Sequence, residues 1–248
     1  MKKICLFLSI AALSLASCSS DSESSTNNPS SDVLVKKIVY TSLMDDYTET
    51  INFTYNGNKL VKGIYSDGSQ ETYTYQGDLI TKIVLSVDGE DDMIEDFTYD
   101  SSGRLTGYYY QEGVYTEQET FVYNSDGTVT GTIGTGSEAV NHTYHFSNGE
   151  LVKIVNNMGQ TYNYTYDAKN SPFKNVTGYG NIAMVTTGDH EFFGRSQNIV
   201  SIHETSGDVN YMANTMTYNA ANYPLTADSV ADFGSGAISH DTMVYTYN

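Results

Sequence analysis

Three glutamates occupy the same position in successive copies of an internal repeat. Glu71, Glu95 and Glu119 each lie four residues before the tyrosine that ends their copy. Residues an even number apart in a β-strand share a face, so these carboxylates should share the face of the aromatic residues. Equivalent strands of neighbouring hairpins lie about 9–10 Å apart, which predicts a row of carboxylates at one level of the sheet. Such a row could bind a cation or a basic ligand, or it could form a solvated rim.

Other residues with catalytic or metal-binding chemistry do not form a recognisable site in the sequence. His142 and His145 are three apart on a predicted strand, so they should point to opposite faces. The acid-rich loop 88–92 lacks the alternating ligands of a calcium-binding loop. No nucleophile elbow, phosphate-binding loop or zinc-protease motif is present. We therefore expect no catalytic residues, no metal and no cofactor. A hydrolase stays an open alternative, because 30 acidic residues always include a suitably spaced pair.

The repeat that carries the glutamates consists of an aromatic residue, usually Thr, then Tyr, then a turn. Its copies end at Tyr55, Tyr75, Tyr99, Tyr123, Phe146, Tyr166, Tyr218 and Tyr247. Steps between the first six are 20, 24, 24, 23 and 20 residues, the length of one hairpin with its turns. Gly, Asn and Asp follow most copies, as tight turns require. The pattern predicts an all-β antiparallel meander of about 16 strands.

A meander of this length must close or fold over to protect its edges. We expect a closed or nearly closed β-barrel with aromatic residues inside, and a twisted open sheet is the alternative. The Thr-rich outer face lacks an apolar band for lipid, so the barrel should be soluble. Residues 171–210 break the repeat, since 52 residues separate Tyr166 from Tyr218. They predict an irregular insertion at one end of the sheet or inside it.

The amino-terminal segment has the features of an export signal. Lys2 and Lys3 precede an apolar stretch, residues 4–15, which is shorter than the about 20 residues that span a bilayer. Leu15-Ala16-Ser17-Cys18 resembles the bacterial lipobox, which implies a signal peptide over 1–17 and a lipid on Cys18. Residues 18–32 should be a flexible tether, and 33–248 a single domain. The only other cysteine is Cys5, so the mature chain should contain no disulfide.

Charge narrows the choice of partner and location. The chain has 12 Lys+Arg against 30 Asp+Glu, a formal net charge of −18, which argues against nucleic-acid binding. Asp21 and Glu23 follow the lipobox cysteine closely, and this resembles the acidic signal for surface display of Bacteroidota lipoproteins. We therefore expect an outer-membrane lipoprotein that faces the cell surface. The alternative is a protein that faces the periplasm.

Two family resemblances accompany these motifs. Residues 97–105, Phe-Thr-Tyr-Asp-Ser-Ser-Gly-Arg-Leu, resemble a single YD/RHS-type repeat. Residues 33–248 are similar to Bacteroidota lipoproteins that carry domain of unknown function 4595. The marks of this second resemblance are the lipobox, the hairpin series, residues 166–175, Asn198-Ile199-Val200 and residues 218–225. It implies a porin-like β fold and carries no assigned activity.

The sequence as a whole favours a lipid-anchored, non-enzymatic envelope protein that binds a glycan, a peptide or a partner protein. The alternatives are a structural or assembly component without a small ligand, and an outer-membrane hydrolase. Two short segments also resemble the acceptor pattern of Bacteroidota O-glycosylation, Asp228-Ser229-Val230 and Asp241-Thr242-Met243. Thr242 alternates with the aromatic face and should point outward. Ser229 lies near a predicted strand end and is expected to be equally accessible.

Overall fold

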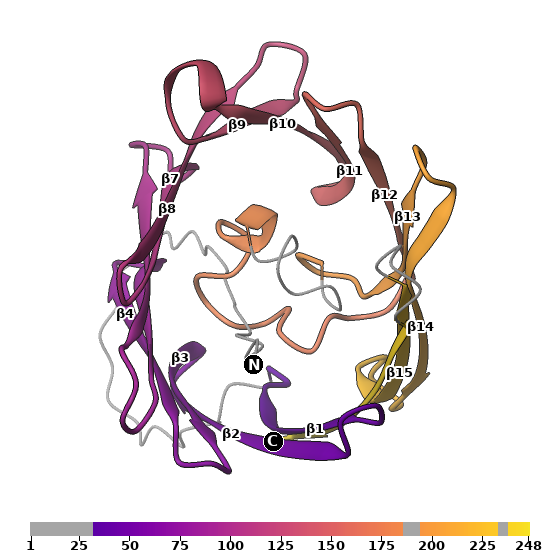
Figure 1. The fold of residues 1–248 in the computed structure, drawn as a ribbon. Helices are drawn as coiled ribbons and strands as arrows, with labels where there is room; N and C mark the ends of the chain where they lie inside the picture. Colours follow the sequence, from indigo (N-terminus) through magenta and orange to yellow (C-terminus); the bar gives the residue numbers. More distant parts are fainter. Residues whose placement is uncertain (1–31, 186–193, 233–237) are drawn as a thin grey trace, which may run out of the picture.

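The computed structural model describes residues 32–185, 194–232 and 238–248. These residues form sixteen antiparallel strands that close into one barrel (Figure 1), which confirms the predicted meander and its closure. The strands are β1 Val35–Ser42, β2 Tyr47–Asn56, β3 Lys59–Tyr65, β4 Gln70–Gln76, β5 Leu79–Ser86, β6 Met93–Tyr99, β7 Leu105–Glu112, β8 Tyr115–Tyr123, β9 Val129–Ile133, β10 Val140–Ser147, β11 Glu150–Asn156, β12 Thr161–Tyr166, β13 Ile199–Glu204, β14 Val209–Tyr218, β15 Pro224–Asp232 and β16 Ile238–Tyr247. A single 3-10 turn, Gly136–Glu138, links β9 to β10.

The barrel is closed by pairing between the first and last strands. Ile38 of β1 lies opposite Tyr245 of β16 on one side and Ile51 of β2 on the other. The ring therefore has no free edge, and the open-sheet alternative is excluded. Closure satisfies the backbone N–H and C=O groups that an edge strand would leave without partners.

The two-residue period of the strands sorts side chains between the lumen and the outer wall. Phe53, Phe97 and Phe121, the aromatic residues of three repeats, are all buried inside the barrel. Thr54 and Thr98, which follow two of them, are exposed on the outer wall. The predicted face assignment is confirmed. On the same outer wall, the ammonium of Lys82 lies 3.0 Å from the carboxylate of Asp96.

In four repeats the closing tyrosine, which is Tyr55, Tyr99, Tyr166 or Tyr247, fastens its strand to the strand before it. The hydroxyl of Tyr55 donates to the carbonyl of Val35 at 2.7 Å, and that of Tyr166 donates to the carbonyl of Leu151 at 2.6 Å. A register shift immediately before each of these tyrosines marks a bulge in the ladder to the following strand. Bulges re-aim side chains, and here the hydroxyl of the ring reaches the backbone of the preceding strand. Burial raises the pKa of both phenols, so they remain hydrogen-bond donors.

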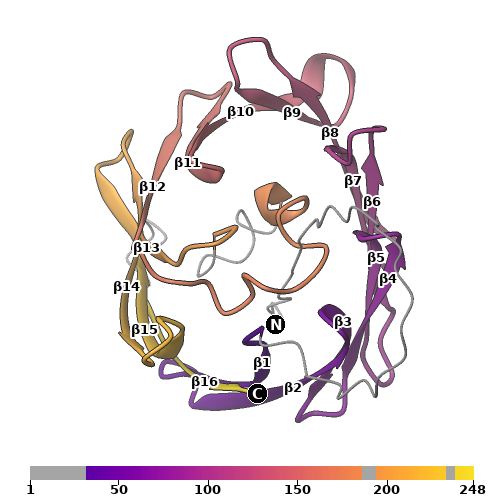
Figure 2. The same cartoon turned by 180° about the vertical axis from the view of Figure 1, so that it is seen from behind.

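Between β12 and β13 the chain leaves the wall and enters the lumen (Figures 1 and 2). We call the described part of this segment, residues 167–185 and 194–198, the plug. The predicted insertion extended to residue 210, but residues 199–204 and 209–210 belong to β13 and β14. The prediction ran too far because these strands lack the aromatic–Thr–Tyr signal until Tyr218.

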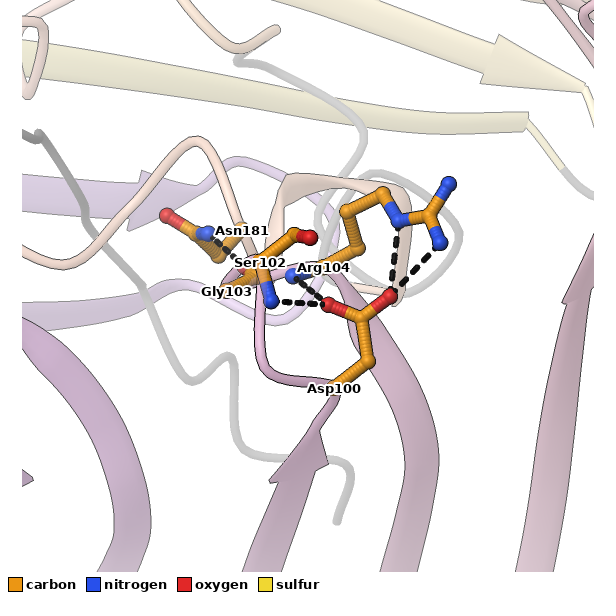
Figure 3. Close-up of polar contacts among 5 residues, drawn as sticks. All are labelled: Asp100, Ser102, Gly103, Arg104 and Asn181. Carbon is orange, nitrogen blue, oxygen red and sulfur yellow. Dashed lines mark hydrogen bonds and ion pairs between the residues drawn. The ribbon is translucent and has the colours of Figure 1, made fainter.

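The plug is fixed to the barrel by apolar packing and by hydrogen bonds to hairpin turns. Phe173 packs edge-to-face on Phe53, with ring centroids 5.7 Å apart. The Asn181 amide donates to the carbonyl of Gly103, in the turn between β6 and β7 (Figure 3). The carboxylate of Asp100 holds that turn by accepting the backbone N–H groups of Ser102 and Arg104 at 2.8 and 3.0 Å.

At the other end of the plug, Glu150 of β11 binds the returning chain. Its carboxylate accepts the backbone N–H groups of Arg195, Ser196 and Gln197 at 2.6, 2.7 and 3.2 Å. The Ser196 hydroxyl adds a further bond of 2.6 Å. One buried carboxylate therefore satisfies three consecutive backbone donors, which fixes the position at which the chain rejoins the wall.

Several predicted features lie outside the described residues. These are the signal peptide 1–17, Cys18 and all of the tether 18–32 except Asp32. In the part of the chain that is described, no helix is both long and apolar enough to cross a membrane.

Candidate functional site

A cavity of about 320 Å³ lies in the lumen between the plug and the wall formed by β7–β14. Met184 and Val185 of the plug line one side of it. The polar residues on the wall are Glu117 and Glu119 of β8, His142 of β10 and Asn156 of β11. Even spacing along β8 turns both glutamates inward. The closed ring brings together residues that are far apart in the chain.

The centre of the polar wall is a hydrogen-bonded group on β8 and β10, the two strands that flank β9. The Tyr144 hydroxyl donates to Glu119 Oε1 at 2.8 Å. His142 Nδ1 lies 3.9 Å from the same carboxylate oxygen and 3.4 Å from the Tyr144 oxygen. On the strand between them, Gly131 makes room, because a Cβ at that position would overlap the Glu119 carboxylate and the Tyr144 ring. A residue without a side chain is therefore required here.

The charge of this group at neutral pH is set by burial. Desolvation lowers the pKa of His142 below 6.5, and the opposing effect of Glu117 is smaller. The imidazole is therefore neutral at pH 7, when it can donate through one nitrogen and accept through the other. The other titratable groups of this wall are the carboxyl groups of Glu117 and Glu119.

Tyrosine rings and aliphatic side chains form the remainder of the cavity surface. The lining tyrosines are Tyr108, Tyr144, Tyr162, Tyr164 and Tyr211. Tyr162 and Tyr211 pack edge-to-face with centroids 5.8 Å apart, and both are half-buried. Asn156 is used structurally, since its side-chain oxygen accepts the backbone N–H groups of Met158 and Gln160. The groups that can face a ligand are therefore the carboxylates, the imidazole and the phenol rings.

The glutamate row is inside the barrel, and only one of its members lines the cavity. Glu71, Glu95 and Glu119 are 0, 9 and 5% exposed. The ladder pairs Tyr73 with Ile83 and Ile83 with Glu95, which displaces Glu95 by two residues relative to Glu71. The displacement is one residue, about 3.3 Å along the strand, for each step of about 4.8 Å to the next strand. This offset matches the tilt of about 35–45° that is usual for barrel strands. The three carboxylates therefore lie at similar heights along the barrel axis.

The other two glutamates of the row have their own surroundings. The Tyr73 hydroxyl donates to Glu71 at 2.5 Å, and Gly63 of β3 lies opposite this carboxylate. Glu95 lies opposite Tyr110 of β7. Cation binding by the row as a whole stays a prediction. Of the three glutamates, Glu119 is the one that lines the cavity.

The two candidate glycosylation residues lie on opposite faces. Ser229 is 1% exposed and points inward opposite Asp241, so its predicted accessibility is wrong for the folded barrel. The error arose because β15 continues to Asp232, which places Ser229 within the strand instead of at its end. Thr242 is half-buried on the outer wall opposite Asp228. Its modification stays a prediction.

The remaining sequence candidates do not add a metal site. His145 is half-buried, and the odd spacing from His142 places it on the outer wall. Within residues 32–185, 194–232 and 238–248, no group of three or more His, Cys, Asp or Glu side chains is arranged to hold a metal ion.

His142 and Tyr162 were not predicted as members of the site, although the repeat carries a signal for them. Each lies two residues before the aromatic residue of its repeat, the position that Glu119 occupies in an earlier copy. A comparison of equivalent positions in successive copies of the repeat, without regard to residue type, identifies both residues. Which copies face the cavity depends on the plug, and the repeat holds no information about that.

Comparison with known proteins supports the fold and no more. The chain is similar in structure to a porin-like protein from Bacteroides uniformis, with a TM-score of 0.53 and 16% sequence identity. The match covers 86% of this chain and 98% of that protein. No family model and no curated protein matches the chain. The resemblances to domain of unknown function 4595 and to YD/RHS repeats therefore stay predictions.

Proposed function

We propose that this protein is a non-enzymatic envelope protein that binds a ligand in the lumen cavity. The observation that carries the proposal is the cavity itself, with Glu119, Tyr144 and His142 joined on one wall. Its volume of about 320 Å³ lies within the roughly 300–1,000 Å³ range of small-molecule sites. A cavity of that size accommodates a small molecule or the end of a glycan or peptide. A purely structural barrel would not need a polar cavity of this kind.

The proposed location is the outer membrane, with a lipid on Cys18 as the anchor and the barrel in water. The outer wall supports this arrangement, because it carries threonines such as Thr54 and Thr98 and the Lys82–Asp96 ion pair. A lipid-facing barrel instead needs a continuous apolar band. Display at the cell surface is the proposed orientation, and the periplasmic side is the alternative.

Cell fractionation tests the anchor directly. Cys18→Ala removes the lipid acceptor, so the variant should leave the membrane fraction for the soluble fraction. Equal membrane retention of wild type and variant would contradict the anchor.

Array binding with a blocked variant tests the ligand site. Full-length protein in detergent is applied to glycan and peptide arrays. Ile133→Trp fills the cavity from β9, and Val122→Trp, on the exposed outer wall of β8, is the matched control. A ligand of the cavity is retained by Val122→Trp and lost with Ile133→Trp. Hits that survive both substitutions would refute the lumen site.

A glycoside hydrolase is the second candidate, because Glu117 and Glu119 place two carboxylates in one cavity. Hydrolysis requires an acid and a base or nucleophile that flank the scissile bond. These two carboxylates lie side by side on one strand, which favours binding. Turnover of chromogenic glycosides that disappears in both Glu117→Gln and Glu119→Gln would reverse this preference.

Thr242 is the proposed glycan acceptor on the outer wall. Intact-mass measurement of protein from the native host should give a mass above that of the lipidated mature chain, and Thr242→Ala should remove the excess. Ser229→Ala should leave the excess in place, because the Ser229 hydroxyl is inside the barrel.

A further inference from the structure

We propose that the lumen cavity binds a small organic cation, an amine attached to an apolar body. This inference rests on the proposed function and adds the chemical class of the ligand. It follows from three properties of the cavity, which are the sign of its charge, the nature of its rings and the division between its polar and apolar walls.

Apart from the neutral His142, the ionisable side chains of the cavity wall other than tyrosine are acidic. Glu117 and Glu119 line it, and no lysine or arginine is among its described lining residues. His142 adds no positive charge at pH 7, since burial favours its neutral form. A recess that carries one sign of charge between low-dielectric walls concentrates ions of the opposite sign. The net charge of −18 acts in the same direction over longer distances. Anionic ligands are therefore disfavoured.

The rings around the carboxylates also suit a cation. Five tyrosines line the cavity, and the face of a phenol ring attracts ammonium and guanidinium groups. The same chain uses this contact elsewhere, since the Lys36 ammonium lies 5.1 Å from the centroid of Tyr55 and the Arg104 guanidinium 4.5 Å from that of Tyr123. In the cavity, the ligand would supply the cationic partner.

The apolar side of the cavity distinguishes an amphipathic amine from a neutral sugar. Met184 and Val185 of the plug and Ile202 of β13 contribute aliphatic surface. A sugar carries hydroxyl groups around its whole ring, and these would lose hydrogen bonds against that surface. An amine with an aromatic or aliphatic body places its charge at Glu119 and its apolar part against the plug.

Calorimetric titration with three matched probes tests the charge requirement. The probes are 2-phenylethylamine, its neutral analogue 2-phenylethanol and the anion 3-phenylpropanoate, titrated into full-length protein in detergent. The amine should bind about tenfold or more tightly than the alcohol, because it adds a charge-assisted hydrogen bond and a cation–π contact. The anion should not bind. Equal affinity for amine and alcohol, or no binding of the amine, would overturn the proposal.

Substitutions then locate the interaction. Glu119→Gln should weaken amine binding about tenfold, and Glu117→Gln, at a half-buried position, gives a second measurement if the first variant does not fold. Glu71→Gln is the matched control, because it removes the equivalent carboxylate of another repeat outside the cavity. Unchanged binding in both Glu119→Gln and Glu117→Gln would refute the assignment.

The blocked variant separates this inference from the proposed function. If an array identifies a neutral ligand that no longer binds Ile133→Trp, the result supports binding in the lumen and contradicts the proposal that the ligand is a cation. If the amine binds wild type and Ile133→Trp equally, it binds outside the cavity, and the cation assignment fails. A lumen site then depends on the arrays alone.

Discussion

The two sides of the barrel are built from the same hairpin repeat and have different interiors. On the side of β1–β5, Leu60, Ile80 and Ile83 are almost completely buried, and the plug packs there through Phe173 and Gly178. On the side of β8–β13, the inward residues Ile133, Ile154 and Tyr162 are only half-buried and face the cavity. We call these the plugged side and the cavity side.

One position of the repeat illustrates the difference between the two sides. This is the position two residues before the aromatic residue of the repeat. It is occupied by Ile51 or Glu71 on the plugged side, and by Glu119, His142 or Tyr162 on the cavity side. What differs is the cavity, because only Glu119, His142 and Tyr162 line it, together with Met184 and Val185 of the plug.

The largest expected effect is the loss of packing on the plugged side. Phe53→Ala should lower the free energy of unfolding by about 3–5 kcal/mol, because it leaves a cavity against Phe173 that the plug cannot fill. Tyr211→Ala should cost about 1 kcal/mol, since its ring already faces the cavity. Urea denaturation of both variants measures the difference.

The matched control for Phe53→Ala is its neighbour on the outer wall. Thr54→Ala removes an exposed side chain and should change the free energy of unfolding by no more than about 0.5 kcal/mol. Similar losses in Phe53→Ala and Tyr211→Ala would show that the two sides are equally packed.

The second prediction concerns the anchor of the plug. Glu150→Ala leaves three backbone N–H groups without their charged acceptor, so the free energy of unfolding should fall by about 2–3 kcal/mol. Glu117→Ala on the cavity side should cost less than about 0.5 kcal/mol. Hydrogen exchange at residues 195–197 should accelerate in Glu150→Ala and stay slow in Glu117→Ala. Unchanged exchange in Glu150→Ala would mean that other contacts hold the plug.

The ring could be predicted from the sequence because its signals are local. Gly and Asn at the turns, the two-residue alternation and the regular return of Tyr55, Tyr75 and Tyr99 all act within one hairpin. Closure was predicted from the cost of free edges, which applies to any long meander.

The plug and the cavity depend on contacts between distant residues, and these left no periodic signal. Asn181 meets Gly103 and Glu150 meets Ser196 across long stretches of sequence. The row of glutamates was predicted on the correct face, but the identity of the copy that faces a cavity depends on where the plug lies. The predicted accessibility of Ser229 was wrong for the same reason, since the end of β15 is set by its pairing with β14 and β16.

The smallest effect is a pH dependence that should belong to the cavity side alone. Burial is the main cause that lowers the pKa of His142 below 6.5. Well above pH 6.5 the imidazole is neutral in both the folded and the unfolded chain, and it contributes nothing to pH dependence. As the pH falls below 6.5, the unfolded chain takes up a proton more readily, so stability is lost. His142→Gln should therefore lose less Tm than wild type between pH 8 and pH 5. Phe53→Leu on the plugged side should lower Tm at both pH values and leave their difference unchanged. If His142→Gln and wild type show the same difference in Tm, the imidazole is solvated in the folded protein, and the recess around Glu119 is wetter than its burial indicates.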